Sequence, residues 1–308
     1  MQCVEPNYYK HFRCKAGECA HNCCIGWDIE IDRKTADFYR SVDGSMGERL
    51  KENIDFLKQP HFKLGKYERC PFLNDENLCD IIIEFGEERL CDICKKHPRF
   101  INELPNRVEI GVGLCCEAAA ELVLSQKESV KLVSDGEMQT DDEIIILRDR
   151  VIALLQNREK SIKGRISDML TLCDTNMPYT TSQLTRLFLS LERLDSGWTD
   201  ILNMVLKNSD TADFNGFDSY MKDRQSELEQ FLVYLAFRHL ANATDLESFA
   251  ARVAFVAASY CLIRAIGTAF FSENGSFDFD AYSNVVRMFS AEIEYSDENL
   301  YILIDSFI

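Results

Sequence analysis

The feature that most constrains this chain is the concentration of cysteine in its N-terminal part. Eleven of the 13 cysteines lie within residues 1–116, and only Cys173 and Cys261 fall outside that stretch. In a reducing compartment, closely spaced thiols more often bind a metal than form disulfides. The candidate ligands therefore lie between residues 14 and 116; they are Cys14, Cys19, Cys23, Cys24, Cys70, Cys79, Cys91, Cys94, Cys115 and Cys116.

These ten thiols are soft ligands of the kind that zinc and iron–sulfur clusters take. A tetrahedral zinc site and a [4Fe-4S] cluster each use about four ligands, so the thiols exceed one site. They fit one cluster with spectator cysteines, two metal sites, or one cluster together with a zinc ion. Cys3, Cys173 and Cys261 are expected to be small buried hydrophobic residues instead.

The overall charge narrows the classes of partner. The chain has 308 residues, a formal charge of −17 and 46% hydrophobic residues. An acidic surface repels nucleic acid and anionic membranes, because phosphate binding needs clustered Lys and Arg. The N-terminal segment has no apolar region of the signal-peptide kind, and the most apolar stretch, 253–263, is too short to span a bilayer. We therefore expect a cytoplasmic protein that binds neither nucleic acid nor membrane.

Several nucleotide-binding and radical motifs are absent from the sequence. No GxGxxG follows a predicted strand and no GxxxxGK[ST] occurs, so neither a Rossmann nor a P-loop site is expected. The pattern of radical S-adenosylmethionine enzymes requires Cys-x3-Cys-x2-Cys, whereas Cys19-x3-Cys23 has no third cysteine at the required offset. A radical mechanism is therefore disfavoured.

Hydrophobic periodicity predicts a mainly α-helical protein with a small β element. Apolar residues alternate with polar ones at 27–31 and at 108–114, which predicts two short strands, the second with one buried face. Between them, Asp32 is placed to cap a helix that begins at residue 33.

The same pattern divides the chain into a cysteine-rich metal domain at 1–126, a polar turn or linker at 126–140, and an all-α domain at 141–308. Asp141 and Ser182 are expected as N-caps in the second domain. Its expected helices are at about 141–157, 159–173, 181–193, 197–208, 214–240, 245–272, 278–293 and 297–307.

A polar run separates the last two helical stretches. It reads Glu292-Ile-Glu294-Tyr295-Ser-Asp-Glu-Asn. Such a run is usually a solvated turn between helices, with Ser296 as the N-cap of the second helix. Glu292, Glu294 and Tyr295 also carry groups that accept or relay protons, so the run is a candidate catalytic site.

Taken together, these motifs resemble the flagellin lysine N-methylase (FliB) family. The cysteine part is shared more loosely with a broad group of zinc- or iron-chelating CxxCxxCC proteins, whereas the tail from Glu292 to Leu300 is more specific. The resemblance is carried by Phe12-Arg-Cys14…Cys19…Cys23-Cys24…Gly26-Trp27, by Cys70-Pro-Phe-Leu…Cys79-Asp-Ile, by Cys91…Cys94…Pro98-Arg99, by Cys115…Glu117-Ala-Ala and by that tail.

The resemblance implies methyl transfer from S-adenosylmethionine to lysine side chains of flagellin, in a protein that carries a [4Fe-4S] cluster, with zinc as the alternative. It marks Glu292, Glu294 and Tyr295 as the catalytic region, although Tyr295 stands where the family usually has histidine. It also makes Cys115 the matching thiol of the last cysteine motif, because Cys116 replaces a proline of the family pattern. The implied ligands are then Cys14, Cys19, Cys23, Cys24, Cys70, Cys79, Cys91, Cys94 and Cys115.

Lysine methylation itself needs neither a radical nor a metal. A neutral amine attacks a sulfonium in line, so the enzyme must bind lysine without its proton although the free pKa is about 10.4. Desolvation and an acidic or tyrosyl acceptor achieve this. The metal is then a structural group or a redox gate. The alternative functions are a non-enzymatic iron–sulfur or zinc module that senses iron or passes electrons, and a helical adaptor with structural zinc.

Overall fold

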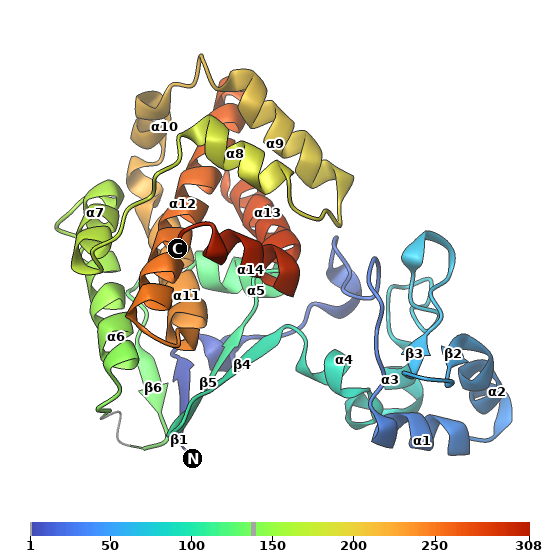
Figure 1. Cartoon of the computed structure of the whole chain (residues 1–308). Helices are drawn as coiled ribbons and strands as arrows, with labels where there is room; N and C mark the ends of the chain where they lie inside the picture. Colours follow the sequence, from blue (N-terminus) through green and yellow to red (C-terminus); the bar gives the residue numbers. More distant parts are fainter. Residues whose placement is uncertain (1, 137–139) are drawn as a thin grey trace. The chain divides into compact units, whose positions relative to one another are not determined.

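The computed structural model describes residues 2–136 and 140–308 and divides the chain into two compact units (Figure 1). The helical unit consists of Met1–Phe12 and Phe100–Ile308, and the cysteine unit consists of Arg13–Arg99. The segment 141–308 lies entirely within the helical unit, whereas 1–126 is divided between the two units. The linker predicted at 126–140 includes residues 137–139, which lie outside the described residues.

A small sheet belongs to the helical unit. Its strand order is β4 (Arg99–Glu103), β5 (Arg107–Val112), β1 (Gln2–Pro6) and β6 (Leu132–Ser134). β1 runs parallel to β5 and antiparallel to β6.

The strand predicted at 108–114 is confirmed as β5, which ends at Val112. Val112 and Leu114 are buried as expected, but the expected burial is wrong for the first half of the strand. Arg107 and Glu109 are more deeply buried than Val108 and Ile110. The cause is an ion pair, because Arg148 donates two hydrogen bonds of 2.8 and 2.9 Å to the Glu109 carboxylate. A charged side chain can occupy a buried face when it is paired in this way.

Most of the helical unit is α-helix, which confirms a mainly helical fold with a small sheet. Two buried helices, α11 (Gln225–His239) and α12 (Leu246–Asn274), lie at its centre (Figure 1). α11 packs against α5 and α6, and α12 packs against α7, α8 and α9. The surrounding helices are α5 (Glu117–Leu124), α6 (Glu143–Leu155), α7 (Ile162–Leu172), α8 (Thr181–Leu189), α9 (Ser196–Asn208), α10 (Phe214–Tyr220), α13 (Phe279–Phe289) and α14 (Asp297–Asp305).

α12 corrects the expectation that the apolar stretch at 253–263 is too short to span a bilayer. The helix continues past Arg252 and Arg264, and by length and composition alone it could cross a membrane. However, 83% of its apolar window is buried inside the protein. Arg264 is accommodated by Asp218, with Nε 2.7 Å from Oδ1. A helix that is apolar on all sides is typical of a protein core as well as of a membrane.

Other helix boundaries differ from the prediction for local reasons. The single helix expected at 214–240 is broken by a 3₁₀ turn at Lys222–Arg224, where the Arg224 guanidinium bonds Glu227 and the carbonyl of Phe277. The helix expected at 278–293 ends at Phe289 and continues as a π-helical turn, Ser290–Glu294. The N-caps are Asp142 and Thr180, each one or two residues from the expected Asp141 and Ser182.

The cysteine unit has its own small core. Asp32 caps its first helix as predicted, because Oδ1 accepts a 3.0 Å hydrogen bond from the amide of Thr35. The strand predicted at 27–31 does not form. Ile29 and Ile31 are buried as the alternation indicates, but the segment makes only an isolated bridge between Glu30 and His61. The elements are α1 (Arg33–Ser41), α2 (Gly44–Asn53), β2 (Ile54–Asp55), β3 (His61–Phe62), α3 (Asp80–Phe85) and α4 (Asp92–Lys96).

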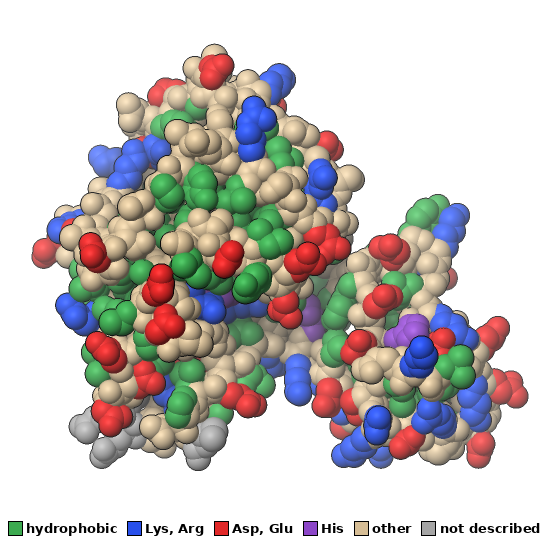
Figure 2. Space-filling view, viewed as in Figure 1, with side chains coloured by type: hydrophobic (Ala, Val, Ile, Leu, Met, Phe, Trp, Pro, Cys, Tyr) green, Lys and Arg blue, Asp and Glu red, His purple; other side chains and the backbone are tan. Residues whose placement is uncertain are grey.

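Charge is dispersed over one face of each unit. On the face drawn in Figure 2, acidic and basic side chains are interspersed, and Lys and Arg do not form a broad continuous area. This distribution, together with the net charge of −17, does not resemble the basic stripe that phosphate backbones require.

The closest packing around α12 yields a test of the core. A Cβ added at Gly267 would stand 2.4 Å from Cζ of Phe217 and 2.9 Å from Cε1 of Phe277, two buried rings. We expect Gly267→Ala to lower the free energy of unfolding by about 1–3 kcal/mol through overpacking, measured by denaturant titration. Gly164→Ala on α7 is the control, since its Cβ would meet only ordinary contacts from 3.5 Å outward. Equal stability of the two variants would contradict this description of the core.

Candidate functional site

The polar run that follows α13 is not a solvated turn. Residues 290–294 form the π-helical turn, and both carboxylates of the run are buried, with Glu292 1% and Glu294 4% exposed. Tyr295 follows the turn and is 42% exposed. Ser296 caps α14 as predicted, through a 3.2 Å hydrogen bond from the amide of Asn299 to its Oγ. The three candidate catalytic residues thus lie in different environments.

Glu292 fastens the tail to another part of the unit. Its two carboxylate oxygens accept hydrogen bonds from the amides of Leu194 and Asp195, at 3.0 and 2.7 Å. Burial raises the pKa of Glu292, against the opposing effect of these two amides. Because both oxygens are engaged with the backbone at the start of α9, the geometry favours a structural role for this residue.

Glu294 lies on the other side of the turn, in a polar cluster with the end of α11. His239 Nε2 is 2.7 Å and Arg238 Nε 3.4 Å from Oε1, and the Tyr234 hydroxyl donates to Oε2 at 3.2 Å. Burial alone would raise the pKa of Glu294, but the charge of Arg238 and the hydrogen bond from His239 outweigh it and lower that pKa. The residue is therefore a carboxylate at neutral pH.

Tyr295 is the partly exposed member of the site. Its hydroxyl is hydrogen-bonded to the thiol of Cys115, and the Arg238 guanidinium lies over its ring at 4.8 Å from the centroid. Burial raises the pKa of the Cys115 thiol to about 12, and burial also raises the pKa of Tyr295. A Cβ at Gly113 would stand 2.1 Å from the Tyr295 hydroxyl oxygen, so only glycine leaves room for the phenol.

Sequence reasoning missed the α11 side of this cluster. Tyr234, Arg238 and His239 are all buried, and they come from a helix whose apolar character predicts only a core role. The available signal was the Arg238-His239 pair at the end of the run FLVYLAF, since two polar residues on a helix buried all round require partners. The partner is about 55 residues away in sequence, beyond any local pattern.

The cysteine unit brings together six of the predicted metal ligands. The side chains of Cys23 and Cys24 are hydrogen-bonded to each other, and so are those of Cys91 and Cys94. The first bond lowers the pKa of Cys23 to about 7, whereas burial raises the pKa of Cys70 to about 11 and also raises that of Cys79. The electrostatic influences that shift these pKa values link Cys23, Cys24, Cys70, Cys79, Cys91 and Cys94 into one group.

The group is not arranged as a finished coordination site. Within residues 2–136 and 140–308, no three His, Cys, Asp or Glu side chains have the geometry to hold a metal ion. Among the described residues, no two cysteines form a disulfide bond. Cys14 is exposed and Cys19 is half-buried, whereas Cys115 belongs to the helical unit beside Tyr295. The donor chemistry of the six grouped thiols fits a soft metal, although their present geometry is that of hydrogen-bonded pairs.

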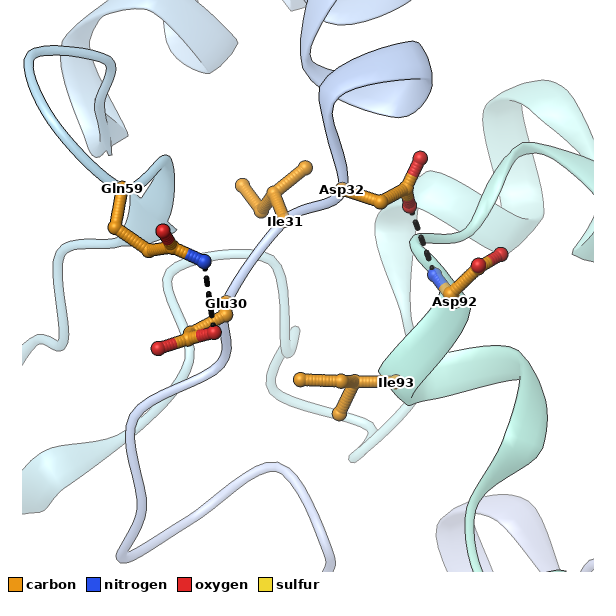
Figure 3. A pocket seen from close by; sticks show the side chains of 6 residues that line it. All are labelled: Glu30, Ile31, Asp32, Gln59, Asp92 and Ile93. Carbon is orange, nitrogen blue, oxygen red and sulfur yellow. Dashed lines mark hydrogen bonds between the residues drawn. The ribbon is translucent and has the colours of Figure 1, made fainter. Parts of the chain in front are cut away.

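A pocket of about 210 Å³ lies in the cysteine unit next to Cys91 and is lined by Glu30, Ile31, Asp32, Gln59, Asp92 and Ile93 (Figure 3). Its polar side chains are engaged within the unit. Asp32 Oδ2 accepts a 3.0 Å hydrogen bond from the amide of Asp92, and Gln59 donates to Glu30 at 2.9 Å. The first bond joins the segment before α1 to the start of α4, which carries Cys94, and the second joins that segment to the loop between β2 and β3.

The C-terminal part of the chain is similar in sequence to known proteins. Residues 177–308 match the FliB lysine N-methylase C-terminal domain. Flagellar biosynthetic protein FliU of Salmonella muenchen is 28% identical over 152 residues, which cover 47% of this chain and 88% of that protein.

The lysine-N-methylases of Salmonella choleraesuis and Salmonella typhimurium are 27% and 26% identical over 136 residues. These matches cover 42% of this chain, and the chain spans only about a third (34%) of the length of either enzyme. No solved structure matches the chain significantly.

The burial of Glu294 leads to a prediction about stability. Glu294→Gln removes the counter-ion of Arg238 while leaving the guanidinium buried, so we expect the free energy of unfolding to fall by about 3–5 kcal/mol in denaturant titrations. Glu298→Gln, at an exposed position on α14, is the matched control and should change stability by less than about 0.5 kcal/mol. A loss for Glu294→Gln no larger than that of the control would show that the pair contributes little.

Proposed function

We infer that this chain, which belongs by its C-terminal domain to the FliB lysine N-methylase family, is a protein-lysine N-methyltransferase that uses S-adenosylmethionine and acts on flagellin. The observation that carries the proposal is the match of residues 177–308 to that domain, which encloses Glu292, Glu294 and Tyr295. The similarity to a protein named for flagellar biosynthesis supports a flagellar substrate.

The acceptor side of the reaction is assigned to Tyr295. The lysine ammonium first gives its proton to solvent water, and desolvation of the amine favours this loss because burial disfavours the charged form. The neutral amine then attacks the methyl carbon, the carbon–sulfur bond breaks, and the sulfonium leaves as a neutral thioether. When the Tyr295 hydroxyl donates its hydrogen to the Cys115 sulfur, the lone pairs of the phenol oxygen remain free to accept an N–H of the amine.

Glu294 contributes to the site through its charge. Its carboxylate is fully buried and engaged with His239, Arg238 and Tyr234, so it supplies negative charge near the amine rather than direct contact. Glu292 keeps the tail in place through the amides of residues 194 and 195. Among the described residues, no arrangement marks the binding site of the methyl donor, and no step is assigned to its surroundings.

We also propose that the grouped thiols of the cysteine unit hold a metal centre, a [4Fe-4S] cluster or alternatively zinc. The six thiols named above offer more soft donors than the about four that either centre takes. The centre would act as a structural group, because methyl transfer to an amine needs no metal. A protein with 13 cysteines and no disulfide bond among its described residues suits a reducing compartment, which supports a cytoplasmic location.

The transferase proposal predicts a large kinetic effect of one hydroxyl. Tyr295→Phe should lower methyl transfer to flagellin by at least about tenfold, since the acceptor amine loses its hydrogen-bond partner, with the melting temperature nearly unchanged. The measurement is transfer of labelled methyl from S-adenosylmethionine to flagellin.

Tyr301→Phe, at a position that is 70% exposed on α14, should react at the parental rate. If Tyr295→Phe also reacts at the parental rate, the catalytic site lies elsewhere. If the parent protein neither binds S-adenosylmethionine in calorimetry nor methylates flagellin, the non-enzymatic metal module becomes the better interpretation.

The metal proposal predicts coupled losses of metal and stability. Cys23→Ser and Cys91→Ser should each lower the metal content and the melting temperature of anaerobically purified protein, because metal–thiolate binding energy is also folding energy. Iron, acid-labile sulfide and zinc assays distinguish a cluster from zinc. Cys261→Ser, on α12 of the helical unit, is the matched control with a much smaller effect. Equal metal content and stability in all three variants would refute the assignment.

A further inference from the structure

Two consecutive residues at the end of α11 are not used by the reaction as described. Arg238 contacts the tail at several points: its Nη1 donates to the Tyr234 hydroxyl at 2.6 Å, and its Nη2 donates to the backbone carbonyl of Glu294 at 3.2 Å. The guanidinium also lies between two rings, 5.0 Å from the centroid of Phe100 and 4.8 Å from that of Tyr295. One side chain therefore holds both the backbone of the π-helical turn and the ring that follows it.

His239 completes the arrangement from the next position of α11. The ring is 3% exposed, packs edge-on against Phe255 and has Nε2 2.7 Å from Glu294 Oε1. Burial lowers the pKa of His239, so the imidazole is neutral at neutral pH. Beside a carboxylate, a neutral imidazole carries its hydrogen on the nitrogen that faces the oxygen, so Nε2 donates to Glu294.

Tyr295 needs such support because much of its side chain is exposed. Gly113 and Cys115 meet the hydroxyl, whereas the side chain is 42% exposed. The Tyr295 hydroxyl has to hold the amine in line with the methyl donor. Its position must therefore be fixed accurately, since a misplacement of about 1 Å can cost about a hundredfold in rate.

We propose that Arg238 and His239 are positioning residues of the methyl-transfer site, which fix Glu294 and the face of the Tyr295 ring and so hold the Tyr295 hydroxyl where the acceptor lysine meets it. This inference rests on the proposed function, in which Tyr295 binds the amine. Neither residue touches the substrate: Arg238 acts through the turn and the aromatic ring, and His239 acts through the Glu294 carboxylate.

A purely structural role would also make these residues intolerant of substitution, so the test must measure coupling to Tyr295. The variants are His239→Leu, His239→Gln and Tyr295→Phe, alone and combined, in metal-loaded protein purified without oxygen. His239→Leu should lower kcat for flagellin methylation about tenfold or more, with KM changed less than about twofold. His239→Gln places an amide N–H near Glu294 and should recover most of the loss.

The decisive measurement is the rate of the variant that combines His239→Leu with Tyr295→Phe. If His239 works through Tyr295, His239→Leu should cost less than about twofold when added to Tyr295→Phe, because the hydroxyl that it positions is already gone. Arg238→Lys keeps the charge but loses the planar stacking and the forked donors, so it should behave in the same way. If His239→Leu does not fold, Arg238→Lys takes its place in the comparison with and without Tyr295→Phe.

The matched control lies on the same helix. Glu229 is buried and paired with Arg158 and Arg165, and it lies about 15 Å along α11 from His239 at 1.5 Å per residue. Glu229→Gln should lower the melting temperature, and its kinetic effect should be equal in the parent and in Tyr295→Phe.

The outcomes separate the two claims. If Tyr295→Phe is slow but His239→Leu costs the same factor with and without it, the positioning inference fails and the proposed function stands. If Tyr295→Phe reacts at the parental rate, the positioning inference and the assignment of the acceptor site to Tyr295 are overturned, whereas the transferase activity itself stands. If the parent protein does not methylate flagellin, the proposed function fails. Failure of His239→Gln to recover activity, in a variant that is folded and loaded with metal, also overturns the role of His239.

Discussion

Charged side chains on a helix that is buried along almost its whole length must find partners, and this requirement governs how the helical unit assembles around α11. Residues 227–239 are all buried, charged ones included. An uncompensated buried charge costs several kcal/mol, so each pair fixes the element that supplies the partner. The charge pairs are Glu227 with Arg224, Glu229 with Arg158 and Arg165, and Arg238 with Glu294, which also accepts a hydrogen bond from the neutral His239.

The π-helical turn allows one short segment to serve two sides of the unit. Residues two apart on a helix do not share a face, so Glu292 and Glu294 point to different neighbours. Glu292 reaches the backbone before α9, whereas Glu294 reaches the end of α11. Short π-helical segments are frequent at functional sites, and this one ends at Tyr295, where the chain returns to the surface.

Local signals were predicted well from the sequence and distant partnerships were not. Asp32 and Ser296 were identified as N-caps because the amide that each accepts from lies only three residues on. The burial at the start of β5 was assigned wrongly because Glu109 is charged and its partner, Arg148, is 39 residues away.

The candidate site could be predicted only in part for the same reason, because its contacts join residues that are distant in sequence. The sequence placed Glu292, Glu294 and Tyr295 in one run, but their burial depends on partners from α9 and α11 that no local pattern reveals. The grouping of thiols followed from spacing only for neighbours such as Cys91 and Cys94, which lie one helical turn apart at the start of α4. That Cys70 and Cys79 join them depends on the fold of the cysteine unit.

The two kinds of cysteine differ in what stabilises them. In the cysteine unit, the pKa values of Cys70 and Cys79 are raised first by burial and further by neighbouring thiols, so both are protonated at neutral pH and a bound metal cation would have to displace their protons. Cys115 instead has a phenol as its partner within the helical unit. The proposed metal centre and the geometry around Tyr295 therefore rest on separate sets of contacts, and substitutions can disturb either one alone.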